Sequence, residues 1–246
     1  MCRILTRLTL VLFGFAFWIT IGADGPLADE EIQRVDLELI LAVDASSSVS
    51  EEEFYLQMHG LATAFRHESV GQAILASGDL GIAVTLVQWA DNRKQKISNH
   101  WRIIRTLEDA VAFADEVDQT ARIVEGGGTA IGGLIKFSLR QLNKNEYEGR
   151  RRVIDISGDG RTNQGIHPQR LKDAVLAEGV TVNGLAILNE DPAIGRYYKD
   201  FVISGTGAFV MSTTSYEDFA AAMLEKLVME ISGTPIAMIG LPQKSG

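Results

Sequence analysis

Cysteine and histidine are scarce in this sequence of 246 residues, which contains one cysteine, Cys2, and four histidines. Beyond Cys2 the chain has no thiol, so it can form neither an internal disulfide nor a cysteine-based metal site. The histidines are scattered along the chain, and we interpret them as surface or hydrogen-bonded side chains. His67-Glu68 lacks the second histidine that a zinc protease helix would carry.

Positive charge is also in deficit, with 23 basic against 32 acidic side chains and a formal charge of -9. The chain has no basic run of five or more residues, so it does not resemble a nucleic-acid-binding protein. The densest basic segment, Arg150-Arg151-Arg152, precedes a strongly apolar stretch. We interpret it as the solvated entrance of a strand, with a binding patch as the alternative.

No apolar run reaches the roughly 20 residues needed to cross a membrane as a helix. The longest, residues 8–21, follows Arg3 and Arg7 and ends in small residues up to Ala23. This order is typical of a secretory signal peptide, which we predict over residues 1–23. Cleavage after Ala28 and an uncleaved membrane anchor are the alternatives. The sequence therefore predicts a periplasmic or secreted protein with no membrane span after cleavage.

The remaining chain has the composition of a folded domain, since 46% of all residues are apolar and 22% are charged. Signal cleavage would leave 21 basic and 32 acidic side chains, a formal charge of -11. We predict one domain over residues 34–232, long enough to bury its own core, and a flexible tail over residues 233–246.

Apolar segments of strand length alternate with amphipathic segments of helix length. The expected strands cover residues 35–43, 80–89, 95–101, 152–157, 181–188 and 208–211. The expected helices cover residues 51–67, 107–119, 130–142, 168–178, 191–202 and 216–231. This alternation predicts an α/β fold with a doubly wound, mostly parallel six-stranded sheet and helices on both faces. The strand at residues 95–101 is expected to lie antiparallel at one edge.

Side chains with oxygen atoms lie in three loops, two of which directly follow an expected strand. Asp44, Ser46 and Ser48 form an Asp-x-Ser-x-Ser pattern after the first strand. Thr129 follows three glycines, and Asp159 follows the strand at residues 152–157. The ligand site of such a sheet lies beyond the carboxyl ends of its central strands. Carboxylate and hydroxyl oxygens at one sheet edge predict a site for a small divalent cation.

These residues give the sequence a resemblance to the von Willebrand factor type A family over Val35 to Ile231. The resemblance implies a complete metal-ion-dependent adhesion site, in which Ser46, Ser48 and Thr129 touch the ion. Asp44 and Asp159 would act largely through bound water. Mg²⁺ is the expected ion, with Mn²⁺ and Ca²⁺ as alternatives. The stretch from Val153 to Gly160 also resembles an exported bacterial subgroup whose physiological role is unassigned.

The function predicted on this basis is binding rather than catalysis. A protein partner would complete the metal coordination with an Asp or Glu carboxylate. The sequence has no Gly-x-Ser-x-Gly elbow, no phosphate-binding Gly-Lys-Ser/Thr loop and no second aspartate at position 46 for an aspartyl phosphatase. Two alternatives stay open: a structural metal site without a partner, and a metal-assisted hydrolase.

Two further residues, Asp155 and Trp89, lie outside the Asp-x-Ser-x-Ser, Thr129 and Asp159 pattern. Asp155 lies within the strand at residues 152–157, where we predict a hydrogen-bonded core acid rather than a metal ligand. Trp89, before Ala90 and Asp91, ends the second strand, where it would either pack over the sheet end or flank the partner surface.

Overall fold

The computed structural model describes residues 32–233. The predicted signal peptide and all but the first residue of the predicted tail lie outside this range. A single sheet has the order β3-β2-β1-β4-β5-β6, and only β3 runs antiparallel to its neighbour. The strands are β1 (Gln33–Asp44), β2 (Ile82–Trp89), β3 (Gln95–Ile104), β4 (Tyr147–Gly158), β5 (Val180–Ile187) and β6 (Val210–Thr213). The predicted mostly parallel sheet with one antiparallel edge strand is confirmed.

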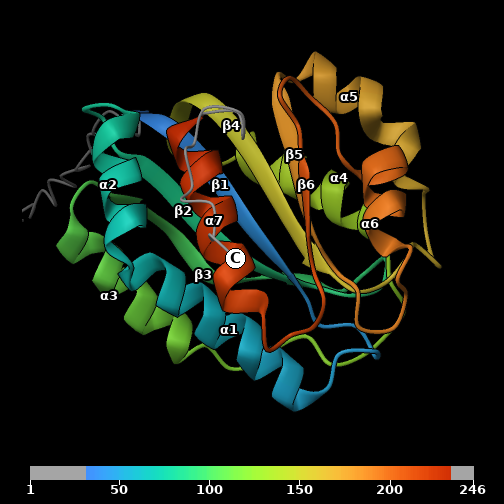
Figure 1. Ribbon diagram of the computed structural model, residues 1–246. Helices are drawn as coiled ribbons and strands as arrows, with labels where there is room; N and C mark the ends of the chain where they lie inside the picture. The colour runs from blue at the N-terminus through green and yellow to red at the C-terminus, as the bar shows by residue number, and fades with distance from the viewer. Residues whose placement is uncertain (1–31, 234–246) are drawn as a thin grey trace, which may run out of the picture. The chain divides into compact units, whose positions relative to one another are not determined.

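Helices cover both faces of the sheet (Figure 1). One face carries α1 (Glu51–Arg66), α2 (Glu68–Ser77), α3 (Leu107–Asp118) and α7 (Phe219–Ser232). The other carries α4 (Ile131–Leu142), η1 (Pro168–Leu171), α5 (Lys172–Ala177), α6 (Ile194–Tyr197) and η2 (Tyr198–Val202). Strand β1 serves both layers, because Leu39 and Leu41 join the first core while Ile40 and Ala42 join the second.

Helix α1 begins with the capping box that the sequence predicts. Ser50 Oγ accepts a hydrogen bond from Glu53 N at 3.2 Å, and Glu53 Oε2 accepts one from Ser50 N at 2.8 Å. Helix α2, in contrast, was not predicted. Its interior Gly71 weakens the helical pattern, yet a Cβ there would lie 1.7 Å from Leu107 Cδ2 of α3. Close packing between the two helices therefore favours glycine and overrides its poor helix propensity.

Two predicted helices are less regular than expected. Residues 168–178 divide into the 3₁₀ helix η1 and the short α5, and residues 191–202 divide into α6 and the π-helical turn η2. Strand β4 begins five positions before the predicted residue 152, because its polar first half still pairs with β1, from Gln33 opposite Tyr147. No helix within residues 32–233 is long and apolar enough to cross a membrane.

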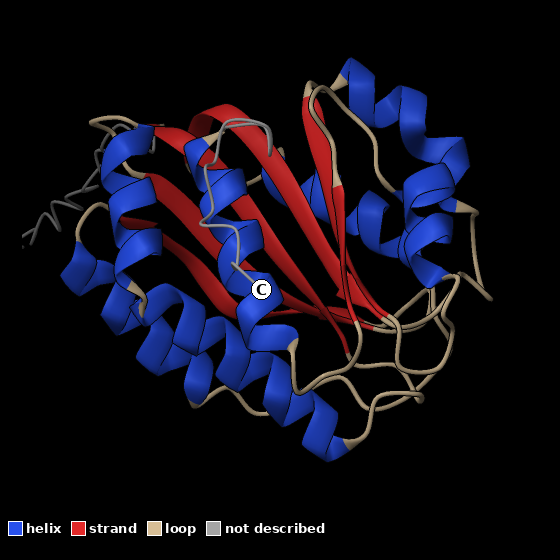
Figure 2. Cartoon of the chain, viewed as in Figure 1, coloured by secondary structure: helices blue, strands red, loops and turns tan. Residues whose placement is uncertain are grey.

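The strand order reverses between β1 and β4, which lie side by side at the centre of the sheet. The chain moves from β1 to β2 on one side, and from β4 to β5 and β6 on the other. Such a switch point opens a crevice beyond the carboxyl ends of the two central strands. Figure 2 shows loops gathered at this edge. This is the edge at which we predicted the metal site.

Candidate metal-binding site

The loop after β1 is folded around the carboxylate of Asp44, which is fully buried. Ser46 N donates a hydrogen bond to Asp44 Oδ1 at 2.7 Å. The hydroxyl oxygens of Ser46 and Ser48 lie 3.1 Å apart. The Asp-x-Ser-x-Ser pattern thus brings one carboxylate and two hydroxyls together within five residues of chain.

Asp159 follows β4 and contacts this loop directly. Ser48 Oγ donates to Asp159 Oδ1 at 3.0 Å. The other oxygen, Oδ2, accepts a hydrogen bond from the hydroxyl of Tyr216 at 3.1 Å. Asp159 is only 2% exposed, so both of its oxygens lie in a defined, nearly buried environment.

Thr129 lies two residues before α4 and next to Gly160, the residue after Asp159. A Cβ at Gly160 would lie 3.1 Å from Thr129 Oγ1, so the glycine after Asp159 lets the two loops approach closely. Thr129 N also donates to Asn163 Oδ1 at 2.8 Å, and Asn163 N donates to Thr129 O at 2.9 Å. These bonds hold the Thr129 backbone against the loop that follows β4.

The glycine-rich loop before Thr129 is tied in turn to the loop after β1. Ser47 N donates to Gly127 O at 3.0 Å, and Gly127 N donates to Ser47 Oγ at 2.8 Å. Gly127 has a φ of +117°, which favours glycine, and a Cβ there would lie 2.8 Å from Asp91 Oδ2. All three predicted loops are therefore joined pairwise at one edge of the sheet, and Asp91 flanks them.

No lysine, arginine or histidine among residues 32–233 forms an ion pair with the carboxylates of Asp44 and Asp159. Asp44 Oδ2 is buried and has no hydrogen-bond partner among residues 32–233. Burial, and then the nearby Asp159 carboxylate, raise the pKa of Asp44 to about 7. Burial also raises the pKa of Asp159. The charged form of this pair is disfavoured, and a cation bound between the loops would relieve that penalty.

The donor set fits a hard divalent cation. It consists of two carboxylates and three hydroxyls, from Asp44, Ser46, Ser48, Thr129 and Asp159. Over the described part of the chain, no three His, Cys, Asp or Glu side chains gather as a potential metal site. Only two of these five side chains are carboxylates, so an ion held here would take much of its coordination from hydroxyl oxygens.

Two supporting residues were not predicted from the sequence. Arg122 is nearly buried, and its Nη2 donates to the backbone oxygens of Ala45 at 3.0 Å and Ser46 at 3.2 Å. Gln57 Nε2 donates to the backbone oxygen of Asp44 at 3.0 Å. Both side chains stabilise the loop after β1 through hydrogen bonds to its backbone oxygens. Arg122 is 77 positions from Ala45, and no local pattern indicates such a contact.

Trp89 closes the buried side of the site, which confirms the packing alternative for this residue. It is fully buried, as is Tyr198. A Cβ at Gly158 would lie 2.8 Å from Asp44 Oδ2, 2.9 Å from Tyr198 OH and 3.2 Å from Trp89 Cζ2. Gly158 therefore leaves the space in which these three side chains meet behind the loops.

Asp155 is a buried core acid, but the predicted hydrogen bonds are absent, because neither of its carboxylate oxygens has a hydrogen-bond partner among residues 32–233. It is 1% exposed and forms an ion pair with Lys226 of α7, with 2.5 Å between Oδ1 and Nζ. It takes no part in the contacts among the three loops.

Comparison with known proteins agrees with this fold. The model of a family described as "Protein of unknown function (DUF1194)" matches residues 34–235. Proximal thread matrix protein 1 from the mussel byssus is similar in structure, with a TM-score of 0.59 and 20% identity over 80% of this chain and 47% of that one. A second structure of that protein, with a zinc-occupied MIDAS motif, has a TM-score of 0.56 and 21% identity over 80% of this chain and 48% of that one.

A von Willebrand factor type A protein from Catenulispora acidiphila has a TM-score of 0.54 and 15% identity over 80% of this chain and 42% of that one. This chain thus spans less than half the length of the structures it matches. No curated protein matches the sequence. The similarities confirm the type A resemblance at the level of the fold.

Proposed function

Since this chain belongs to the DUF1194 family of proteins of unknown function and has a von Willebrand factor type A-like fold, we propose that it is an exported, metal-dependent protein-binding domain. Ser46, Ser48 and Thr129 would hold a divalent cation, Mg²⁺ in the first instance, with the charges of Asp44 and Asp159 close by. A partner protein would supply an Asp or Glu carboxylate to the ion.

The observation that carries this proposal is the buried pair Asp44 and Asp159. Asp44 Oδ2 has neither a hydrogen bond nor a contacting cation within the described chain. Burying an ionised carboxylate without a partner is strongly unfavourable. A divalent cation is the group that this pair lacks, and the neighbouring hydroxyls supply the remaining hard oxygen ligands. The zinc-occupied MIDAS motif of the mussel byssus protein supports the same chemistry here.

Charge around the site favours a partner that depends on the ion. Helix α1 begins beside the site with Glu51, Glu52 and Glu53, and Glu53 contributes to the raised pKa of Asp159. With the formal charge of -11 expected after signal cleavage, 21 basic against 32 acidic side chains, the exported protein as a whole repels an acidic partner. Attraction must then come from the ion itself. We therefore propose that removal of the metal abolishes binding of a carboxylate partner rather than weakening it.

We propose binding rather than catalysis because the donor set offers an electrophilic ion and no positioned base. Export through the predicted signal over residues 1–23 would place the domain in the periplasm or outside the cell. Sequencing the N-terminus of the secreted protein tests the export step. An N-terminus at Asp24 or Asp29 supports export with cleavage, and Met1 retained in the membrane fraction favours the uncleaved anchor. Met1 retained in the cytoplasmic fraction contradicts export.

Mn²⁺ can serve as a probe of the proposed binding mode. The proton relaxation rate of water reports how many exchangeable water molecules contact protein-bound Mn²⁺. A short peptide with one central Glu should lower this relaxation enhancement by displacing water from the ion. The same peptide with Gln at that position should leave the enhancement unchanged, because a neutral amide is a poorer ligand for the exposed charge.

The control and the alternatives use the same protein. Asp44→Asn, which should not hold Mn²⁺, must show no enhancement with either peptide. Metal-dependent melting with no effect of the Glu peptide would favour a purely structural site. Turnover of p-nitrophenyl phosphate that requires Mn²⁺ and Asp44 would favour the hydrolase instead.

A further inference from the structure

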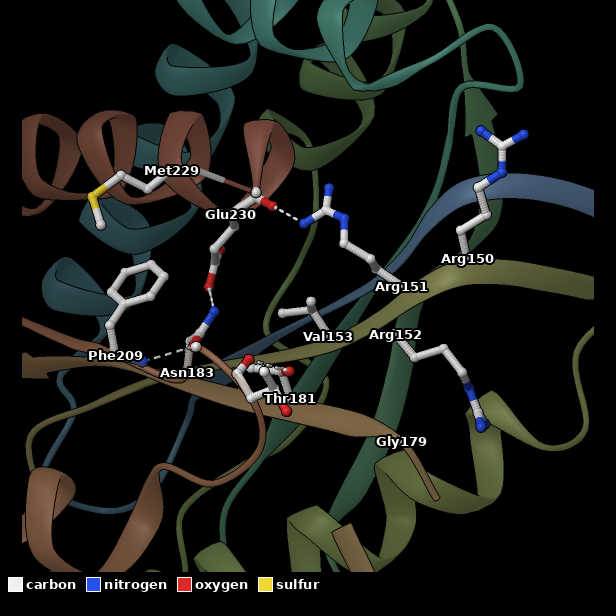
Figure 3. A pocket seen from close by; sticks show the side chains of 13 residues that line it. Arg150, Arg151, Arg152, Val153, Gly179, Thr181, Asn183, Phe209, Met229 and Glu230 are labelled. Atoms are coloured by element: carbon white, nitrogen blue, oxygen red, sulfur yellow. Dashed lines mark hydrogen bonds between the residues drawn. The ribbon is translucent and has the colours of Figure 1, made fainter. Parts of the chain in front are cut away.

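A cavity of about 640 Å³ lies at the opposite edge of the sheet, between the amino ends of β4 and β5 and the C-terminal end of α7 (Figure 3). Its volume lies in the range of small-molecule sites. The wall is partly apolar, from Val153, Phe209 and Met229, and partly charged, from Arg151 and Glu230. Neither the metal site nor its proposed partner uses any of these residues.

Glu230 is 2% exposed and has one unused oxygen. Its Oε1 accepts from Lys226 Nζ at 2.5 Å and from Asn183 Nδ2 at 2.8 Å. Its Oε2 is buried without a hydrogen-bond partner among the described residues. Figure 3 shows the carboxylate extending from α7 into the cavity toward Asn183. One carboxyl oxygen of a residue that lines the cavity is therefore buried without a hydrogen bond.

The charges behind Glu230 do not balance. Lys226 also pairs with Asp155, so one ammonium group serves two buried carboxylates. Burial, and then the Asp155 carboxylate, raise the pKa of Glu230 to about 8. A positively charged donor at Oε2 would complete both the hydrogen bonding and the charge of the cluster.

Two of the three consecutive arginines in the cavity wall already have carboxylate partners. Arg150 Nη1 lies 2.6 Å from Asp36 Oδ1. Arg152 Nε lies 4.0 Å from Glu38 Oε1. The positive charge of each is therefore compensated before any ligand arrives.

Arg151 differs from its neighbours, because it has no carboxylate partner within residues 32–233. Its Nη1 donates to Glu230 O at 2.7 Å and its Nη2 to Ile231 O at 2.5 Å, both at the end of α7. A guanidinium has five N–H groups, so others stay available to an anion. Burial lowers the pKa of Arg151, which means that its charge is incompletely solvated.

We propose that this cavity binds a free α-amino acid with an apolar side chain. The ligand's ammonium group would donate to Glu230 Oε2, and its carboxylate would accept from Arg151. Val153, Phe209 and Met229 would contact the side chain. A simple amine or a simple carboxylate satisfies only one of the two unpaired groups, whereas a zwitterion satisfies both.

Calorimetric titration of the chain from Asp24 onward tests the proposal. L-leucine, L-methionine and L-phenylalanine are the probes, and isopentylamine and 4-methylpentanoate are leucine analogues without the carboxylate or the amine. At least one amino acid should bind with a stoichiometry of one, and each leucine analogue should bind at least tenfold more weakly than leucine. No binding by any amino acid, or an analogue as tight as leucine, overturns the proposal. EDTA should have no effect, which separates this site from the metal site.

Matched variants locate the site in the same titration. Glu230→Gln and Arg151→Gln should each raise the dissociation constant at least tenfold. Arg150→Gln and Glu225→Gln are the controls, since Arg150 has its own carboxylate and Glu225 is exposed on α7. Circular dichroism confirms the fold of each variant. Equal effects of Arg150→Gln and Arg151→Gln would contradict the proposed contact.

Discussion

Strand β4 brings a buried carboxylate to each of two clusters, Asp155 along its length and Asp159 just beyond its end. Asp155 shares its cluster with Glu230, and Asp159 shares its cluster with Asp44. In both, burial and a neighbouring carboxylate raise a pKa, to about 8 for Glu230 and to about 7 for Asp44. In each cluster, two negative charges are buried close together, which disfavours the ionised form of both carboxylates.

They differ in where the compensating charge comes from. Lys226, which is fully buried, contacts both carboxylates of the first cluster at 2.5 Å. No lysine or arginine in the described chain forms an ion pair with Asp44 or Asp159, and hydroxyls surround them instead. The first cluster thus contains its own cation and ties α7 to the sheet. We propose that the second, which has no such residue in contact, takes an ion from solution instead.

The largest expected effect comes from removing the internal cation. Lys226→Met should destabilise the protein by about 3–5 kcal/mol, because it leaves two buried carboxylates uncompensated. Urea unfolding followed by circular dichroism measures the change. Lys199→Met, on an exposed side chain, is the matched control and should stay within about 0.5 kcal/mol. A small effect of Lys226→Met would show that the ammonium does not support the fold.

Stability without metal should fall as pH rises from about 4 to 8. The ordinary pKa of an aspartate is 3.8, and that of folded Asp44 is about 7, so the native state holds more protons than the unfolded state in this window. The loss from Asp44 is on the order of 4 kcal/mol. Glu230, raised from 4.5 to about 8, acts in the same direction.

Adding Mg²⁺ distinguishes the loss of stability caused by the metal site from the loss caused by Glu230, because the ion would bind only at the metal site. Urea unfolding at several pH values, with EDTA or with Mg²⁺, should show that the ion restores only the part that belongs to Asp44 and Asp159. Stability that rises from pH 5 to pH 8 in EDTA would contradict the raised pKa values. Full restoration by Mg²⁺ would mean that Glu230 contributes nothing.

Asp44→Asn should change stability in the opposite direction from Lys226→Met. It removes one of two uncompensated carboxylates and keeps an oxygen that can accept from Ser46 N. At pH 8 in EDTA, the variant should be about 1–2 kcal/mol more stable than the wild type. Differential scanning calorimetry in EDTA and in Mg²⁺ measures both effects. A less stable variant in EDTA would indicate that Asp44 is already compensated within the protein.

Thr129→Ala should have the smallest effect. It removes one hydroxyl ligand and no charge, so Mg²⁺ affinity should fall about tenfold, or about 1.4 kcal/mol. The fold should persist, because the Thr129 backbone keeps its bonds to Asn163. Thr214→Ala, at an exposed position, is the control for isothermal titration. Unchanged affinity in Thr129→Ala would exclude this hydroxyl from the site.

The comparison also shows what the sequence could predict. Asp44, Ser46 and Ser48 lie within one short loop at a strand end, so strand order alone predicts where their side chains meet Asp159. The side chains that contact these clusters from outside the loops come from distant parts of the chain. Lys226 meets Asp155, Arg122 meets Ala45, and Tyr216 meets Asp159 only through tertiary packing. A single sequence carries no local signal for such pairs.

Helix α2 was missed for a related reason. Its glycine disfavours a helix locally, and only contact with α3 explains why the glycine is there. The predicted boundary of β4 was wrong because the first half of this strand is polar and therefore lacks the apolar pattern from which strands were predicted. The apolar pattern of the sequence predicts most helices and strands. The elements that it misses are those stabilised mainly by contacts with other elements.

The most direct test of the central claim is calorimetric titration of Mg²⁺ and Mn²⁺ into the chain from Asp24 onward, with Asp44→Asn alongside. The account predicts saturable binding of one ion per chain in the wild type and none in the variant. A folded wild-type protein that binds neither ion, or a variant that binds as well as the wild type, would contradict it.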